Sequence, residues 1–279
     1  MKAKKLFALL VVIALLSLSL AAFAEENAIP SPIDGDNAIS IGVTAIPHGE
    51  IVNDIVKSKL EAAGWQVKVV EFTDYLLPNT SLEAGEIDAN YFQTIRYLQE
   101  ENSKRGLHLV AVAGIHLEPM GLYSEKYTDL KDLPDGASIA VPNDGSNESR
   151  ALKLLADNSL IVLSETEELY NLQSIAENAH NYQIVELNAE NLTRNLPDVD
   201  AAVINGNYAL QAGLNPSTDA LIAEKAESDE SYKYINYLVV KEGNEDSVKT
   251  QALTKALSNE DVKKYIEEKY SGSVIPAFN

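Results

Sequence analysis

The stretch QVKVVEFTDYLLPNTSLEAGEIDANYFQTIRYLQEENSKRGLHLVAVAGI, residues 66–115, decides the fold of this chain. Its β-rich runs cover residues 66–72, 87–92 and 108–115. The first connection predicts a short helix that begins after Asn79, a good capping residue, and the second predicts a helix over residues 94–105 that ends before Gly106. Strands that alternate with helices predict an α/β fold of parallel sheets with right-handed crossovers.

The same alternation continues through the rest of the chain. Further strands are predicted over residues 39–45, 138–142, 183–187, 199–204 and 235–241. Further helices are predicted over residues 48–63, 147–156, 189–196 and 208–212, and two more close the chain, the last one capped by Ser258 in a capping-box-like pattern with Asp261. About seven or eight strands are enough for two sheets.

Two sheets in one chain of this length predict two lobes. The helical tail after Ser247 is expected to pack back on the first sheet, so lobe 1 is discontinuous. We expect lobe 1 over residues 38–120 plus 234–279 and lobe 2 over residues 121–233, with the chain crossing between them near 121–127 and 230–234.

The N-terminus has the pattern of an export signal. Lys2, Lys4 and Lys5 precede an apolar run over residues 6–22 and an Ala22-Phe23-Ala24 end, which predicts a signal peptide over residues 1–24 that is cleaved after about Ala24. A retained membrane anchor is the alternative. Residues 25–37 are rich in Pro, Asp, Gly and Asn, and we expect a flexible tether there.

Cysteine and charge exclude several kinds of chemistry. Leu20-Ala21-Ala22 resembles the start of a bacterial lipoprotein box, but Phe23 takes the place of the lipidated residue and the chain has no cysteine, so no lipid anchor is expected. Disulfides and cysteine nucleophiles are excluded too. The acidic residues outnumber the basic ones by 42 to 22, and residues 1–24 hold three of the lysines, so the exported chain carries a net charge of −23. Such a charge disfavours nucleic acid and anionic membrane as partners.

Aromatic and amide side chains gather within residues 71–97. Tyr75, Phe92 and Tyr97 lie there among Asp, Asn and Gln residues, although aromatic residues make up only 7% of the chain. Rings supply apolar area and amides supply orienting hydrogen bonds, a combination typical of a pocket for a small amphipathic molecule.

Two further segments place polar groups just after predicted strands, where ligands bind in open α/β sheets. In residues 141–150, VPNDGSNESR, a Gly-containing turn leads to a helix start, where free backbone N–H groups and Arg150 favour a carboxylate. The alternative is that Arg150 pairs with an acidic residue of the protein itself. Asn205 ends the strand in AAVINGNY, and its amide can donate and accept, although an ordinary Asn-Gly turn explains it as well.

No catalytic or metal-binding pattern is present. The four histidines are scattered without metal-ligand spacing, and G-x-S-x-G, G-x-G-x-x-G and Walker patterns are absent from the sequence. His48 and His116 follow predicted strands and could line a cleft, so they are weaker candidates for ligand contact. We therefore predict no catalytic residue, no metal and no cofactor.

At these same segments the chain resembles the methionine-binding proteins of bacterial ABC importers, the MetQ/NlpA lipoprotein family. The resemblance covers nearly all of residues 39–278 and includes GVTAIPHGEI, EFTDYLLPNTSLEAGEIDANYFQ, LVAV, HLEPMGLYS, IAVPNDGSNESRAL, DAAVINGNYALQAGL and EEKYSGSVIPAF. It implies a two-lobed periplasmic-binding-protein fold with a hinge and a central ligand cleft. It also implies delivery of the bound amino acid to a membrane permease with its ATPase.

The resemblance assigns roles to single residues. The ligand side chain is expected among Tyr75, Phe92 and Tyr97, and the α-carboxylate and α-amino groups at Arg150 and Asn205. Asn147 is a lesser candidate for the same contacts.

Departures from the family pattern affect specificity and anchoring. The family usually reads F-Q-H-x-P-Y-L, whereas this chain has Thr94 in place of the His and Arg96 in place of the Pro. Amino-acid binding is therefore expected more firmly than methionine specificity, and a different apolar amino acid or a methionine-containing dipeptide is an option. The alternatives to transport are a periplasmic enzyme that uses carboxylates, His48 or His116 in the same cleft, and a secreted surface protein that has lost transport.

Overall fold

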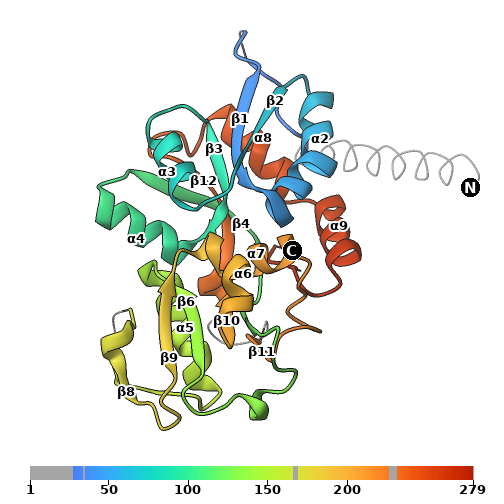
Figure 1. The fold of residues 1–279 in the computed structure, drawn as a ribbon. Coiled ribbons are helices and arrows are strands. Elements are labelled where there is room, and N and C mark those ends of the chain that lie inside the picture. The colour runs from blue at the N-terminus through green and yellow to red at the C-terminus, as the bar shows by residue number, and fades with distance from the viewer. Residues whose placement is uncertain (1–27, 34, 166–168, 226–230, 279) are drawn as a thin grey trace, which may run out of the picture.

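The computed structural model describes residues 28–33, 35–165, 169–225 and 231–278. Two large sheets organise this part of the chain, a six-stranded sheet of order β13-β4-β12-β3-β1-β2 and a five-stranded sheet of order β11-β5-β10-β6-β9. Figure 1 shows the first sheet in the upper half of the molecule and the second in the lower half. A separate pair joins β7 (Val162–Leu163) and β8 (Ile175–Glu177).

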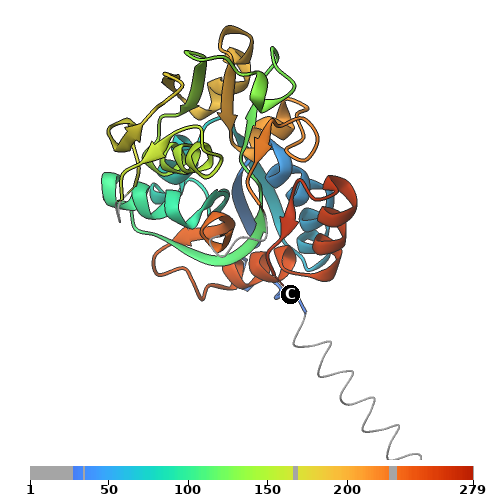
Figure 2. The same ribbon diagram turned by 90° about the horizontal axis from the view of Figure 1, so that it is seen from below.

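The six-stranded sheet is built from both ends of the chain. Its strands are β1 (Ala38–Thr44), β2 (Gln66–Phe72), β3 (Ala89–Thr94), β4 (Leu109–Leu117), β12 (Ile235–Lys241) and β13 (Ile275–Pro276). The helices around it are η1 (Ala45–Gly49), η2 (Val52–Val56), α2 (Lys57–Ala62), α3 (Leu76–Glu83), α4 (Ile95–Arg105), α8 (Val248–Leu257) and α9 (Glu260–Tyr270). Ile41 of β1 shares one core with Leu60 of α2, Leu253 of α8 and Ile266 of α9. Figure 2 shows the two C-terminal helices, in red, beside the blue N-terminal helices.

The five-stranded sheet is formed by the middle of the chain. Its strands are β5 (Gly121–Tyr123), β6 (Ser138–Pro142), β9 (Gln183–Leu187), β10 (Ala201–Ile204) and β11 (Ile222–Ala223). Its helices are η3 (Leu130–Asp132), α5 (Gly145–Asp157), η4 (Leu172–Ser174), η5 (Ala189–Asn191), α6 (Leu192–Asn195), η6 (Leu196–Asp198) and α7 (Gly206–Gln211), and η7 (Ser231–Tyr234) leads back to the first sheet. The apolar side of α5, including Leu152 and Leu155, packs on one face with Val203, whereas Leu192 and Tyr208 pack on the other face with Ile204.

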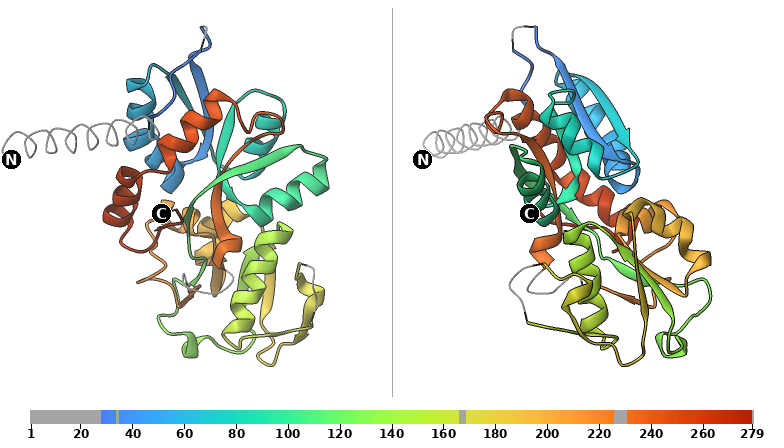
Figure 3. Two further views of the ribbon diagram at one scale, coloured as in Figure 1. Left: turned by 180° about the vertical axis from the view of Figure 1, so that it is seen from behind. Right: turned by 60° about the vertical axis from the view of Figure 1, so that its left-hand side comes forward.

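The prediction of parallel sheets is wrong for several strands. β1 pairs in parallel with β2 and β3, and β6 pairs in parallel with β9 and β10. However, β12 runs antiparallel to β3 and to β4, and β5 runs antiparallel to β10 and β11. The chain leaves the first sheet after β4, forms the second sheet with its helices, and returns to the first sheet as β12. No single helical crossover therefore connects these strands and makes them parallel. Figure 3 shows these two connections between the halves of the molecule that hold the two sheets, in green and in orange.

Short strands were missed because two or three residues give no readable period. The described residues contain thirteen strands where seven or eight were predicted, and β13 interrupts the tail that was predicted to be all helix.

Two predicted helix caps are also wrong. Helix α3 starts at Leu76 rather than after Asn79, because Asp74 Oδ1 accepts hydrogen bonds from the backbone N–H groups of Leu76 and Leu77, each at 2.8 Å. Helix α9 is capped by Asn259 rather than Ser258. In both cases a carboxylate or amide oxygen of a residue other than the predicted cap accepts from the free N–H groups of the first turn.

The N-terminal segment is described only from residue 28, so the predicted signal peptide over residues 1–24 lies outside the described residues. The described part of the predicted tether makes contacts where the sequence predicts no structure. Ile29 packs against the first core, and Pro30 O accepts a hydrogen bond of 2.8 Å from Trp65 Nε1. Among the described residues, no helix has the length and hydropathy needed to cross a bilayer.

Candidate functional site

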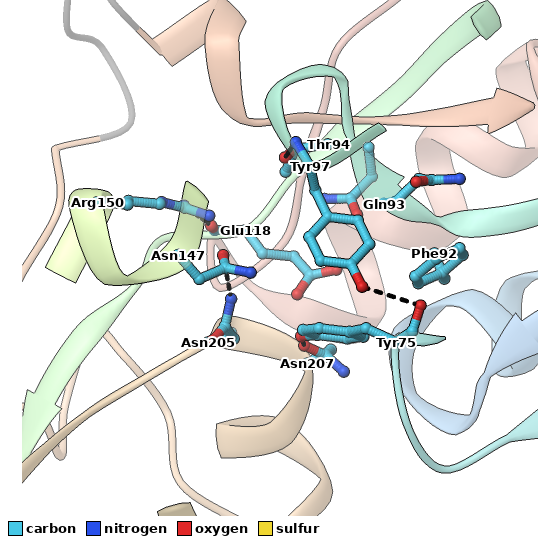
Figure 4. Close-up of a pocket in the computed structure, with 12 residues that line it drawn as sticks. Tyr75, Phe92, Gln93, Thr94, Tyr97, Glu118, Asn147, Arg150, Asn205 and Asn207 are labelled. Atoms are coloured by element: carbon cyan, nitrogen blue, oxygen red, sulfur yellow. Dashed lines mark hydrogen bonds between the residues drawn. The ribbon is translucent and has the colours of Figure 1, made fainter. Parts of the chain in front are cut away.

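A pocket lies between the two sheets, with about 350 Å³ of space between atoms when the part open to solvent is included. Residues of the first sheet and its helices line one side, namely Tyr75, Phe92, Gln93, Thr94, Tyr97, Glu118 and Asn236. Residues that follow strands of the second sheet line the other, namely Asn147, Arg150, Asn205, Gly206 and Asn207. The structure therefore brings together Tyr75, Phe92, Thr94, Tyr97, Asn147, Arg150 and Asn205, the main predicted site residues (Figure 4). Their contact with a ligand stays a prediction.

Three aromatic rings form the apolar wall. The centroid of Tyr75 lies 5.8 Å from that of Phe92 and 5.6 Å from that of Tyr97. Thr94 ends β3 and caps α4 by accepting a hydrogen bond from Tyr97 N at 3.3 Å, which places Tyr97 in the first helical turn beside Tyr75. The hydroxyl of Tyr97 donates to Tyr75 O at 3.1 Å (Figure 4). A side chain of about the size of methionine or leucine fits the chemistry of such a wall.

Amide side chains face this wall from the second sheet. Asn205 follows β10, and its Nδ2 donates to Asn147 Oδ1 at 2.8 Å (Figure 4). Asp144 Oδ1 fixes Asn147 in turn, accepting from its backbone N at 3.0 Å and from its Nδ2 at 2.8 Å. Across the pocket, Asn207 Oδ1 accepts from the hydroxyl of Tyr75 at 2.5 Å.

Two buried polar atoms of this wall lack a hydrogen-bond partner among the described residues. They are the carbonyl oxygen Oδ1 of Asn205 and the amide nitrogen Nδ2 of Asn207. A buried donor or acceptor without a partner costs about 1–3 kcal/mol, so such atoms are expected where a ligand completes the network. One is an acceptor and the other a donor, which suits a ligand that carries both kinds of group.

Arg150 lines the pocket, yet its strongest contacts are to the protein. Its Nε donates to Glu224 Oε1 at 2.7 Å and its Nη2 donates to Glu224 Oε2 at 2.5 Å and to Glu118 O at 2.8 Å. The guanidinium also lies 4.1 Å from the ring centroid of Tyr234. The alternative kept open by the sequence, pairing with an acid of the protein, is therefore what the structure shows. The other terminal nitrogen, Nη1, makes no hydrogen bond to a described residue.

Glu118 enters the pocket from the end of β4 and was not predicted. Its Oε1 lies 2.6 Å from His116 Nε2 and 3.4 Å from His48 Nε2, and all three residues are buried. Burial lowers the pKa of His48 to about 4 and that of His116 to about 3, and burial raises the pKa of Glu118. Both imidazoles are therefore neutral at neutral pH.

His116 is hydrogen-bonded to Glu118 and His48 Nε2 to Asn236 Oδ1 at 3.1 Å, and neither histidine is among the residues that line the pocket. His48 Nδ1 lies 2.8 Å from Thr44 Oγ1, and His116 Nδ1 is hydrogen-bonded to the hydroxyl of Tyr91. Both rings are buried, with their centroids 4.8 Å apart, and the weaker prediction that the two histidines contact a ligand stays a prediction.

His48, His116 and Glu118 are residue types that bind metal ions, so their spacing can be compared with that of metal ligands. One ligand atom each from His48, His116 and Glu118 lie within 4.8 Å of one another. Ligand atoms of tetrahedral zinc are separated by about 3.3 Å, given bond lengths near 2.0–2.1 Å. The 2.6 Å contact between His116 and Glu118 is shorter and has the length of a hydrogen bond. The arrangement is thus a hydrogen-bonded network.

The other residues missed by the sequence had weak signals. Gln93, Asn207 and Glu118 lie inside quoted motifs, and Asn236 lies in a predicted strand. Glu224 had no signal, since acidic residues are too numerous for one to be selected without distances.

Several known proteins are similar to this chain in sequence and fold. A family profile described as NlpA lipoprotein matches residues 39–278. The methionine-binding lipoprotein MetQ of Bacillus subtilis is 38% identical over 248 residues, covering 87% of this chain and 89% of the relative. A nutrient-binding protein from Burkholderia cenocepacia, solved bound to methionine, is 41% identical with a TM-score of 0.82, covering 86% of this chain and all of that one. An ABC transporter periplasmic substrate-binding protein from Coxiella burnetii is 39% identical with a TM-score of 0.80, over 86% of this chain and all of that one.

The relatives confirm the predicted fold class and family but not every detail. Curated relatives are named lipoproteins, which goes against the prediction of no lipid anchor, a prediction based on the absence of cysteine from this sequence. The predicted motifs, the matching profile and the similar solved structures agree over nearly the whole described chain, and the chain belongs to the NlpA lipoprotein family.

Proposed function

We propose that this chain is the extracytoplasmic solute-binding protein of an ABC importer. It binds L-methionine or a closely related amino acid or dipeptide between its two sheets and delivers it to a permease with its ATPase. The observation that carries the proposal is the pair of unpartnered buried atoms, Asn205 Oδ1 and Asn207 Nδ2, opposite an aromatic wall. The names of the relatives, MetQ and a nutrient-binding protein bound to methionine, support the choice of ligand.

The polar groups match the two ends of an amino acid. The ligand carboxylate accepts from Asn207 Nδ2 and from the free Nη1 hydrogens of Arg150. The ammonium group donates to Asn205 Oδ1, which has no other donor among the described residues. The side chain then lies among the rings of Tyr75, Phe92 and Tyr97, where a thioether sulfur gains about 0.3–1.5 kcal/mol per ring contact.

Binding is coupled to closure of the two lobes, residues 38–120 plus 234–279 and residues 121–233. Contacts already cross between them, because Tyr75 donates to Asn207 and the hydroxyl of Tyr208 donates to Thr73 O at 3.1 Å. A ligand that touches both walls stabilises the closed arrangement by its higher affinity for that state, and the two connecting strands serve as the hinge.

Calorimetric titration with L-methionine tests the proposal. Arg150→Ala and Asn205→Ala should each weaken binding at least about tenfold, or about 1.4 kcal/mol, because each removes a group that meets the amino-acid backbone. Asn53→Ala, a matched change at an exposed residue of η2, should bind like the wild type. Unchanged affinity in both folded pocket variants would remove these residues from the site.

The same protein distinguishes binding from catalysis. Mass spectrometry of material that co-purifies with the native chain should recover an unmodified amino acid or dipeptide. Turnover of added methionine or of a methionine-containing peptide would instead favour the enzyme alternative.

A further inference from the structure

Glu118 places a buried carboxylate in the middle of the pocket. The residue is 5% exposed, and Figure 4 shows its carboxylate between the Asn147–Asn205 pair and the ring of Tyr97. A carboxylate withdrawn from water in this way costs several kcal/mol unless a cation and hydrogen-bond donors compensate it.

Arg150 is the protein cation that acts on the Glu118 carboxylate, and it lowers the pKa of that group through space but donates its side-chain hydrogen bonds elsewhere. His116 Nε2 is hydrogen-bonded to Oε1 at 2.6 Å, whereas His48 Nε2 lies 3.4 Å from it and is hydrogen-bonded to Asn236 Oδ1 at 3.1 Å. Both rings are neutral at neutral pH. Arg150 contacts the backbone oxygen of Glu118, while two of its N–H groups bind the carboxylate of Glu224. The charge of Arg150 is thus largely offset by Glu224.

The second sheet closes the remaining side of this carboxylate. The backbone of Gly206, at the start of α7, lies so close that an added Cβ would be 2.7 Å from Cβ of Glu118 and 3.0 Å from its Oε2. His116 lies on one side of the carboxylate, and Gly206 with the backbone N–H of Asn207, which donates to it, lies on the other. These contacts fix the orientation of Glu118, and its remaining side faces the pocket.

We propose that Glu118 is the receptor for the α-ammonium group of the ligand and that His116 is a positioning residue that holds its Oε1. The inference rests on the proposed function and deepens it. The ammonium group bridges Glu118 and Asn205 Oδ1, so the pocket selects molecules with a free, protonated amine. Analogues that lack the amine or carry it acylated are rejected, because they leave the carboxylate without a cation in hydrogen-bond contact.

The experiment compares L-methionine with 4-(methylsulfanyl)butanoate, the same molecule without its amine. Both are titrated calorimetrically into the full chain after reversible unfolding has removed any co-purified ligand. The wild type should prefer methionine by at least about 30-fold, the lower end for truncating one partner of a buried charged pair. Glu118→Gln, which keeps shape and hydrogen bonding, should reduce this preference to about threefold or less, and His116→Gln should reduce it partly. Glu101→Gln, a matched change at a buried glutamate of α4 that pairs with Arg105, should leave it unchanged.

The possible outcomes distinguish failure of the inference about Glu118 from failure of the proposed function. Methionine binding with an undiminished preference in folded Glu118→Gln overturns the inference and leaves the proposed function standing. If Glu118→Gln does not fold, the wild type decides, because equal affinity for the two compounds overturns the inference as well. Failure of the wild type to bind any amino acid or dipeptide overturns the proposed function.

Discussion

The ion pair between Arg150 and Glu224 offers the sharpest test of how this pocket is supported. It joins helix α5 to the residue that follows β11, and the two side chains are only 5% and 17% exposed. Removing Arg150 leaves the Glu224 carboxylate with Met120 N, which donates to it at 2.8 Å, as its remaining hydrogen-bond partner among the described residues. We therefore expect Arg150→Ala to lower the free energy of unfolding by about 3–5 kcal/mol, the usual cost of leaving one member of a buried pair uncompensated.

The double variant should cost much less than the two single changes together. Glu224→Ala leaves the buried guanidinium with Glu118 O and the ring of Tyr234, at a cost of about 2–4 kcal/mol. With both groups removed neither charge stays unpaired, so the two changes should be coupled by about 2–3 kcal/mol.

The wild type, the two single variants and the double variant form a double-mutant cycle. Chemical denaturation followed by circular dichroism measures the free energy of unfolding of each of the four proteins. The exposed pair Lys153 and Asp157, on the same helix, provides the control, and its coupling should stay within about 0.5 kcal/mol. If the Arg150 and Glu224 changes also add within about 0.5 kcal/mol, the pair does not support the pocket and the reasoning fails.

Two further predictions concern specificity and pH. Thr94→His should strengthen the binding of L-methionine relative to that of alanine, because the larger ring encloses the methionine side chain. It should also lower the free energy of unfolding by about 1 kcal/mol, because the hydrogen bond that caps Tyr97 N is lost. Equal calorimetric changes in affinity for both ligands would contradict the first expectation. Burial raises the pKa of Asp144 from 3.8 to about 6, so its contribution to stability is complete below about pH 4 and is lost as the pH rises through about 6. Asp144→Asn, which keeps an acceptor for Asn147 N, should therefore raise Tm at pH 7.5 and change it little at pH 4, and a lower Tm at pH 7.5 would count against this account.

Much of the fold could be predicted because the deciding signals are local. The strands over residues 66–72, 138–142, 183–187 and 235–241 occur with the predicted bounds, since each is a short run of β-branched or apolar residues between turns. Strand direction could not be predicted in this way, because the pairing of β12 with β3 and β4 depends on where the chain re-enters the sheet.

The residues of the pocket also fall into a group that the sequence predicted and a group that it did not. The aromatic rings were found because aromatic residues are scarce, and the amides because they stand close after predicted strands, as Asn205 does. The carboxylates were not found, because Glu118 and Glu224 belong to a set of 42 acidic residues whose local surroundings look alike.

The sequence by itself determined the family, the α/β class and which strand ends supply the pocket, because hydrophobic period, turn residues and long motifs are properties of neighbouring residues. Only the tertiary structure decided which charges meet. Arg150 binds Glu224, 74 residues further along the chain, since electrostatic pairing depends on distances and burial that neighbouring residues do not reveal.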